Sequence, residues 1–130
     1  MPVVVDASAM AAVIFREEGH EDVVSRLRGA SLAAPELLKS ELTQVALTKA
    51  RRYPRLAAEI FSRLEVFLDP RRGIRWHDVP PVDVALLAQV TGLSAYDATY
   101  MWLAGWLEAD LVTLDRRLSG ATGFPAESPE

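Results

Sequence analysis

Short apolar runs alternate with helical patterns along this chain of 130 residues. The run at residues 3–5 is β-branched and uninterrupted, which is typical of a strand buried on both faces. The run at 111–114 has the same character. Strands that alternate with helices fold into βα units around a parallel sheet. The pattern therefore predicts an α/β fold with a central parallel sheet of four to five short strands, flanked by helices.

The expected elements follow from the spacing of apolar residues and from the residues at their ends. Ser8 is the expected cap of the first helix, which Gly19 closes. Pro35 is expected to open the third helix, and Ser94 to cap a long apolar one. We expect strands at 3–5, 32–34, 74–79 and 111–114, helices at 9–18, 21–28, 35–51, 54–68, 82–90 and 95–107, and a helical turn after 115.

Composition and length fit a single globular domain. Hydrophobic residues make up 50% of the chain and charged residues 25%, which is enough apolar material for a core. We expect one domain over residues 1–124 and a flexible, proline-broken tail over 125–130. The absence of cysteine excludes disulfides, thiolate metal sites and cysteine nucleophiles. With no membrane-length apolar run and no secretory signal pattern, a cytoplasmic location without a membrane partner is expected.

Four carboxylates stand where the pattern favours apolar or neutral residues. Asp6 and Asp115 each follow a predicted buried strand directly, and the carboxyl ends of parallel strands form the sheet edge where α/β proteins bind ligands. Glu41 interrupts the apolar stripe of its helix. Asp97 lies in the first turn of a helix that is almost entirely apolar. The sequence therefore predicts that these four acids belong to one site.

Each acid also has a purely structural explanation. Asp6 and Asp115 could cap the turns that follow them, and Asp97 lies three residues after Ser94, as in a capping box. Glu41 could pair with an arginine. Four unrelated explanations are then required, whereas a single site accounts for all four acids.

A divalent cation would explain several carboxylates at one site. Ionised carboxylates repel one another and raise one another's pKa unless a positive charge compensates them. An all-oxygen set without cysteine, with His20 and His77 in unremarkable contexts, favours Mg²⁺, or Mn²⁺ as its substitute, over Zn²⁺. Both ions are usual partners of phosphoryl chemistry. The acids therefore predict a Mg²⁺ or Mn²⁺ site suited to phosphate chemistry.

The residues around the acids resemble a known family, the PIN domain. The motifs are Val-Val-Val-Asp-Ala-Ser at 3–8, Glu-Leu-Leu-Lys-Ser-Glu-Leu at 36–42, Ser-Ala-Tyr-Asp-Ala at 94–98 and Thr-Leu-Asp at 113–115. Within that family the chain is most similar to the VapC toxin ribonucleases of type II toxin–antitoxin systems, over residues 3–124. The resemblance implies a Mg²⁺- or Mn²⁺-dependent endoribonuclease, commonly a homodimer, that a cognate antitoxin holds.

The resemblance also assigns roles to individual acids. Asp6, Glu41, Asp97 and Asp115 match the four acidic catalytic positions. It implies that Asp6 and Asp97 bind the metal, and that Asp115 binds it directly or through water. It implies that Glu41 binds the metal or orients the attacking water. The implied reaction leaves a 3′-hydroxyl and a 5′-phosphate.

Two hydroxyl residues match accessory positions of the family. Ser8 and Thr113 are suited to hydrogen bonds that orient the carboxylates. Aromatic residues divide by context. Tyr53 and Trp76 lie beside arginines and are candidates for stacking on single-stranded RNA. The pair Trp102 and Trp106, together with Tyr100, is expected in the core or at a dimer contact.

Basic residues are concentrated between positions 49 and 75. This segment carries eight basic and three acidic residues, a charge of +5, whereas the rest of the chain carries −9. A local positive field can steer a polyanion to an acidic protein. A solvated surface whose arginine stems cover apolar neighbours is the alternative. Two more arginines follow Asp115 and could hold a phosphate. The candidate RNA-binding residues are Arg51, Arg52, Arg55, Arg71, Arg72, Arg75, Arg116 and Arg117.

Other functions stay open at this point. A PIN nuclease with a housekeeping role in RNA processing would carry the same acids. A binding module could use them to hold a structural metal or an arginine-bearing peptide without catalysis. A receiver-like phospho-acceptor domain is disfavoured, because the only lysines, Lys39 and Lys49, do not end a late strand.

Overall fold

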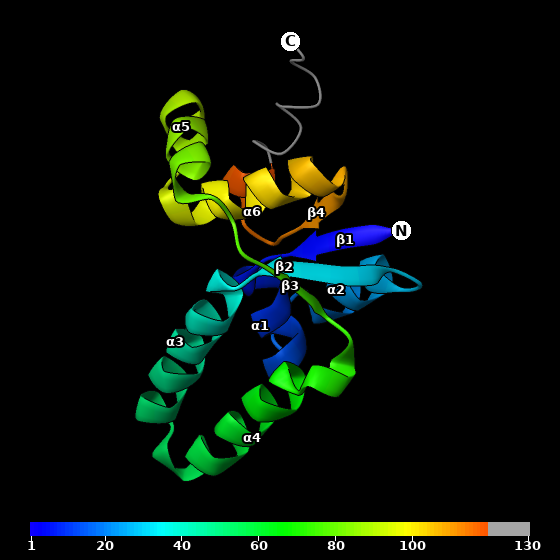
Figure 1. Cartoon of the computed structure of the whole chain (residues 1–130). Helices are drawn as coiled ribbons and strands as arrows, with labels where there is room; N and C mark the ends of the chain where they lie inside the picture. The colour runs from blue at the N-terminus through cyan, green and yellow to red at the C-terminus, as the bar shows by residue number, and fades with distance from the viewer. Residues whose placement is uncertain (120–130) are drawn as a thin grey trace.

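Four parallel strands form the centre of the structure, a computed structural model that describes residues 1–119 (Figure 1). Their order across the sheet is β3-β2-β1-β4. Val4 of β1 pairs with Ala33 on one side and with Leu111 on the other. The predicted parallel α/β fold is confirmed, with four strands in this part of the chain. The strands are β1 (Pro2–Val5), β2 (Ser31–Pro35), β3 (Arg75–His77) and β4 (Asp110–Val112).

Helices cover both faces of the sheet. Figure 1 shows α5 and α6 on one face, and α1 with the hairpin of α3 and α4 on the other. The inner strand β1 is apolar on both faces as a result, and its residues Val4 and Val5 are completely buried. The helices are α1 (Ala7–Phe15), α2 (His20–Leu27), α3 (Leu37–Arg52), α4 (Ala57–Leu68), α5 (Pro81–Thr91) and α6 (Ala95–Leu107), with short 3₁₀ turns η1 (Pro54–Leu56) and η2 (Pro70–Arg72).

The strand order places a ligand-binding edge. The chain moves from β1 to β2 and β3 on one side, and returns to the other side of β1 with β4. The order therefore reverses between β1 and β4, and α/β sheets bind ligands outside the carboxyl ends of strands at such a point. Asp6 and Thr113 are the residues that directly follow β1 and β4.

The start of the first helix differs from its prediction. Asp6, not Ser8, is the cap of α1, because its side chain accepts a hydrogen bond from the backbone N–H of Ala9. The helix also ends earlier, where Arg16 takes a left-handed conformation with φ 54°. Gly19, expected to close this helix, instead precedes α2 with φ 90°. Glycine takes a positive φ without steric cost, so this sharp entry suits it.

Other boundaries shift for local reasons. Pro35 is the last residue of β2 rather than the first of a helix, and α3 begins at Leu37. Proline has no N–H to donate, so it suits the end of a strand ladder. The predicted strand at 74–79 shortens to three residues, and the predicted helix at 54–68 divides into η1 and α4. The predicted bounds of α6 and its cap Ser94 are confirmed.

The last expected strand ends at Val112, and a helical turn covers 116–119 as predicted. The expected domain end at 124 and the expected tail at 125–130 lie outside the described residues. None of the described helices combines the length and apolar character required to cross a membrane.

Candidate active site

The four acids come from four separate elements and act on one another electrostatically. Asp6 follows β1, Glu41 lies on α3, Asp97 in the first turn of α6, and Asp115 after β4. The negative charge of Asp115 raises the pKa of Asp6 and of Asp97. The charges of Asp97 and Asp6 raise the pKa of Glu41. The structure therefore brings the four predicted carboxylates into one region of like charge.

Asp6 is the most enclosed of the four, with 4% of its surface exposed. Its Oδ1 accepts hydrogen bonds from Ser8 Oγ at 2.8 Å and from the N–H of Ala9 at 3.0 Å. Its Oδ2 accepts from Thr113 Oγ1 at 2.5 Å. Burial raises the pKa of Asp6, the three hydrogen bonds lower it, and the net direction is upward.

The capping explanation for Asp6 is correct but incomplete. The bond from Ala9 is a helix cap, which any buried aspartate at this position could accept. The bond from Thr113, however, comes from a residue 107 positions away. A cap does not require a second, distant hydroxyl on its other carboxylate oxygen. Asp6 thus caps α1 and is held by β4 at the same time.

Ser8 and Thr113 connect the start of α1 to the end of β4. Their hydroxyl oxygens lie 3.2 Å apart. Ser8 Oγ accepts the N–H of Leu114 at 2.9 Å, and Thr113 Oγ1 accepts the N–H of Asp115 at 2.9 Å. The two hydroxyls therefore fix the orientation of Asp6 and the turn that carries Asp115.

Asp115 caps the helical turn that follows it. Its Oδ1 accepts the N–H of Arg117 at 2.9 Å and that of Leu118 at 3.5 Å. Capping of the turn, the structural explanation for Asp115, is therefore confirmed. Capping uses only one of the two carboxylate oxygens, and the charge of the group still acts on Asp6 and Asp97.

Glu41 is bound by a tyrosine and not by an arginine. Tyr100 Oη, from a side chain 2% exposed, donates a hydrogen bond of 2.5 Å to Glu41 Oε1. Partial burial raises the pKa of Glu41 most, the bond from Tyr100 opposes it, and Asp97 and Asp6 add to the rise. Burial and the Glu41 carboxylate raise the pKa of Tyr100 strongly, so the phenol remains a donor.

Sequence analysis did not single out Tyr100. Its place on an almost entirely apolar helix predicts a core or dimer contact and no role at the acids. The available signal was spacing, since residues three apart on a helix share a face and Tyr100 lies three residues after Asp97.

Asp97 is the most accessible of the three acids with a shifted pKa. Partial burial raises its pKa, Asp115 and Asp6 raise it further, and Arg117 and the bond to Ser94 oppose this. Its backbone N–H donates to Ser94 Oγ at 3.1 Å, which is the expected cap of α6. This cap bond uses the backbone N–H of Asp97, and the Asp97 carboxylate is not part of it.

The donor set suits a hard divalent cation in chemistry and charge. All candidate ligands are carboxylate or hydroxyl oxygens, and each of Asp6, Glu41 and Asp97 pays an electrostatic cost for its neighbours' charge. As the side chains stand, however, residues 1–119 contain no group of three carboxylates or histidines close enough to hold a metal together. Shared ligation therefore requires these side chains to turn toward one another.

Of the candidate arginines, Arg117 is the one whose charge acts on the acids, since it lowers the pKa of Asp97. Arg51 and Arg52 end α3, and Arg55 lies in η1, at the tip of the hairpin formed by α3 and α4 (Figure 1). Arg51 is ten residues beyond Glu41, or about 15 Å along the helix at 1.5 Å per residue. An RNA contact at the tip stays a prediction.

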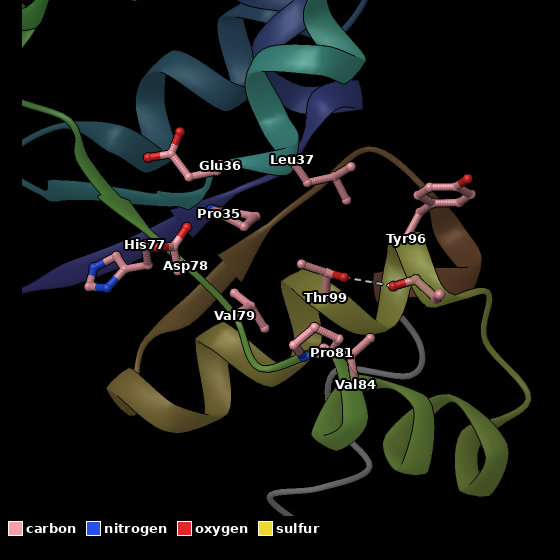
Figure 2. Close-up of a pocket in the computed structure, with 11 residues that line it drawn as sticks. Pro35, Glu36, Leu37, His77, Asp78, Val79, Pro81, Val84, Tyr96 and Thr99 are labelled. Carbon is pink, nitrogen blue, oxygen red and sulfur yellow. Dashed lines mark hydrogen bonds between the residues drawn. The ribbon is translucent and has the colours of Figure 1, made fainter.

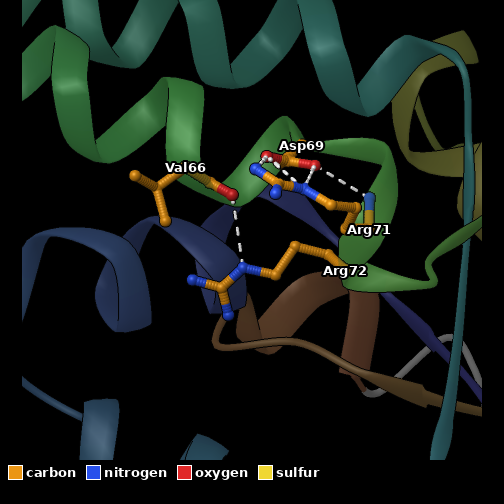
Figure 3. A network of polar contacts seen from close by, with 4 residues as sticks. All are labelled: Val66, Asp69, Arg71 and Arg72. Carbon is orange, nitrogen blue, oxygen red and sulfur yellow. Dashed lines mark hydrogen bonds and ion pairs between the residues drawn. The ribbon is translucent and has the colours of Figure 1, made fainter.

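The other candidate arginines of the basic segment lie just before β3 or at its first residue. Arg71 pairs with Asp69 at 2.6 Å, and Arg72 Nε donates to the carbonyl oxygen of Val66 at 3.2 Å (Figure 3). Arg75 opens β3 and so lies at the amino edge of the sheet, opposite the acids. Their RNA contacts, and that of Arg116, also stay predictions.

Comparison with known proteins places these features in a family. The PIN domain family matches residues 3–123. Ribonuclease VapC3 of Pyrobaculum aerophilum is 34% identical over 129 residues, which cover 97% of each chain. The crystal structure of PAE2754 from the same organism superimposes with a TM-score of 0.71 and 28% identity, over 92% of this chain and 86% of that one. The Mycobacterium tuberculosis toxin VapC20, which cleaves the sarcin-ricin loop, has the same fold, with a TM-score of 0.65 and 17% identity over 92% and 94% of the two chains.

Proposed function

The chain belongs to the PIN domain family and is homologous to the VapC ribonucleases, and from this premise we propose that it is a Mg²⁺-dependent endoribonuclease and the toxin of a toxin–antitoxin pair. Asp6, Glu41, Asp97 and Asp115 are the proposed catalytic residues. The observation that carries the proposal is their mutual electrostatic coupling at the switch point of the sheet. Carboxylates gathered without a compensating cation repel one another, and stable folds keep such a cluster where it serves chemistry.

Asp6, Asp97 and Asp115 are the proposed metal ligands. When bound, Mg²⁺, or Mn²⁺ in its place, supplies positive charge against the phosphate oxygens and lowers the pKa of a water molecule. Asp6 contributes a carboxylate whose orientation is already fixed by Ser8 and Thr113. Asp97 contributes an accessible carboxylate that can turn toward Asp6.

Glu41 is the proposed base that accepts a proton from the attacking water. The pKa of Glu41 is raised above that of an exposed glutamate and so lies closer to neutral pH, which favours proton acceptance during the reaction. Tyr100 holds Oε1 by a hydrogen bond and leaves Oε2 as the acceptor. Arg117 is the proposed contact to the cleaved phosphate or to a neighbouring one. The leaving group is the 3′-hydroxyl, and the product carries a 5′-phosphate.

A cleavage assay with a matched variant tests this proposal. We expect purified protein to cut structured RNA with Mg²⁺ and to stop on addition of EDTA. Asp6→Asn should abolish cleavage, whereas Asp83→Asn, an exposed acid of α5 away from the site, should leave it unchanged. Cleavage that persists in EDTA or in Asp6→Asn would contradict the assignment of the site.

Metal binding has an independent readout in stability. A ligand bound only by the native state stabilises it by RT ln(1 + [L]/Kd), about 2.7 kcal/mol at a hundredfold excess over Kd. We expect millimolar Mn²⁺ to raise the melting temperature of the wild type and of Asp83→Asn. It should have a much smaller effect on Asp97→Asn. An equal rise in all three proteins would place the ion elsewhere.

The proposed partners are RNA, a cognate antitoxin and a second copy of the chain, all in the cytoplasm. An exposed apolar stripe on α5 supports the homodimer: Val82, Leu86 and Val90 are 70%, 58% and 75% exposed at successive helical turns. Leu86→Asp should shift a dimer to a monomer in sedimentation equilibrium, while Val24→Asp, at another exposed apolar residue, should not. Co-purification with the product of the neighbouring gene, and inhibition by it, separates a toxin from a housekeeping nuclease.

A further inference from the structure

A pocket with a volume of about 370 Å³ lies beside the acids, at the carboxyl ends of β2 and β3 (Figure 2). Its size falls within the usual range of small-ligand sites, roughly 300–1,000 Å³. We propose that it binds one unpaired nucleobase of the RNA, and that it selects a base with an exocyclic amino group over uracil. This inference rests on the proposed ribonuclease function.

The sheet places the pocket next to the proposed site of cleavage. Pro35 and His77, which line it, are the last residues of β2 and β3, and β2 is the neighbour of β1. Strands lie about 4.8 Å apart, so the end of β3 is about 10 Å from the end of β1, where Asp6 stands. A base beside the cleaved phosphate can reach across that distance.

The pocket also shares two helix starts with the acids. Leu37 lines the pocket one helical turn before Glu41 on α3. Tyr96 lines it and directly precedes Asp97 on α6. A base in the pocket would therefore contact the same helices that carry two of the proposed catalytic acids.

The charges that line the pocket favour a base over a phosphate. The lining residues that the structure describes include Glu36 and Asp78 and no lysine or arginine. Glu36 is paired with Lys39 at 2.9 Å. Asp78, in contrast, has no hydrogen bond or ion pair within residues 1–119. Its carboxylate is free to accept hydrogen bonds, and the amino group of cytosine is a donor that aspartate and glutamate accept.

The remaining lining suits an aromatic ring. Pro35, Val79 and Pro81 provide apolar walls, and Tyr96, 62% exposed, stands at the other end of the hollow from Asp78 in Figure 2. Proteins read unpaired bases by stacking them on aromatic side chains and bonding their edges. Asp78 would bond the edge of the base, and Tyr96 would contact the ring from the opposite end of the hollow.

Binding of cytidine and uridine tests the pocket without any metal or cleavage. The two nucleosides carry no charge and differ at position 4, where cytidine has an amino donor and uridine a carbonyl acceptor. In NMR titrations in EDTA we expect cytidine to shift the backbone signals of Leu37, Val79 and Tyr96. We expect its dissociation constant to be about fivefold lower than that of uridine, or lower still, because one base-specific contact provides about 1–3 kcal/mol.

Two variants distinguish the hydrogen bond to the base edge from the aromatic contact with its ring. Asp78→Asn offers an amide that can donate to uridine, so the ratio of the two dissociation constants should fall to about one. Tyr96→Ala should weaken both nucleosides by a similar factor, about fivefold or more. The matched controls Asp83→Asn and Phe61→Ala, at exposed positions outside the lining, should keep the wild-type ratio and affinities.

The results separate this inference from the proposed function. Equal shifts with both nucleosides, shifts away from the pocket, or no shifts would overturn the base pocket even if the protein cleaves RNA. Selective cytidine binding at the pocket would support it even if the cleavage assay fails.

Discussion

Tyr100 Oη donates a hydrogen bond of 2.5 Å to Glu41 Oε1 and so joins α6 to α3. These helices lie on opposite sides of the sheet (Figure 1), and the bond connects them near its carboxyl edge. Tyr100 is 2% exposed, so water does not compete for its hydroxyl. The bond therefore positions the acid that we propose as the base.

Replacement of Tyr100 by phenylalanine should raise the pKa of Glu41. The hydrogen bond favours the ionised carboxylate and lowers its pKa, so its loss leaves burial and the charges of Asp97 and Asp6 less opposed. We expect the titration of the Glu41 carboxyl, followed by ¹³C NMR, and the acidic limb of the cleavage profile to move to higher pH together. Stability should fall by about 1–2 kcal/mol.

The control for this variant is Tyr53→Phe. Tyr53 is exposed at the hairpin tip, so the same change there should leave the titration of Glu41 in place. If Tyr100→Phe loses stability while the titration stays fixed, Tyr100 serves packing alone.

Asp97→Asn should stabilise the metal-free protein at neutral pH and not in acid. The pKa of Asp97 is higher in the folded state than the ordinary value of an aspartate in the unfolded chain, so the folded state binds more protons than the unfolded state between those two pKa values. The free energy of unfolding therefore decreases as the pH rises through that window. Asparagine does not titrate and escapes this loss.

Urea unfolding in EDTA at pH 3 and pH 7 measures this difference. We expect equal stabilities of wild type and Asp97→Asn at pH 3, and an advantage of the variant below about 1 kcal/mol at pH 7, because the group is partly exposed to solvent. Asp83 occupies the same first-turn position on α5, and Asp83→Asn should bring no gain. A variant that is less stable than wild type at pH 7 would show that the charge of Asp97 mainly supports its helix end.

Thr113→Val should disturb two acids at once. The Thr113 hydroxyl donates to Asp6 and accepts the N–H of Asp115, and valine has the same shape without either function. We expect a loss of about 1–3 kcal/mol in stability and a large loss of cleavage. Thr113→Ser keeps the hydroxyl and should restore most of both. Wild-type stability and cleavage in Thr113→Val, together with a defect in Thr113→Ser, would assign the role of Thr113 to its methyl group.

The positions of Asp6 and Asp115 were predictable because they depend on strand ends. A buried β-branched run followed by aspartate is visible in sequence, and parallel strands place such residues at one edge. The caps required knowledge of geometry that sequence spacing does not carry. Ser8 and Asp6 are both good cap residues, and only the turn after β1 decides that Asp6 accepts the N–H of Ala9 while Ser8 reaches Leu114.

Long-range partners were the least predictable part of the site. The bond between Tyr100 and Glu41 joins residues 59 positions apart, and no local rule pairs them. A tyrosine on an apolar helix surface is expected in the core, and the partner of its hydroxyl is defined only once the helices are packed. Charge density in the sequence predicts an RNA contact within 49–75, which stays a prediction, whereas Arg117 is the candidate arginine that lowers the pKa of one of the four acids, Asp97.

Arg117 and the arginines of the hairpin tip should affect RNA in different ways. Arg117 lowers the pKa of Asp97, so Arg117→Gln should raise that pKa and reduce cleavage of every RNA tested.

The triple change of Arg51, Arg52 and Arg55 to glutamine removes charge about 15 Å from Glu41. If the tip contacts RNA, the triple variant binds more weakly and the slope of log K against log salt becomes shallower by about 0.7 for each lost phosphate contact. Fluorescence anisotropy with single-stranded RNA at several salt concentrations, in EDTA, measures both the binding affinity and its salt slope. An unchanged slope in the triple variant would assign the tip to protein surface or to a protein partner, and an unchanged Asp97 titration in Arg117→Gln would remove Arg117 from the site.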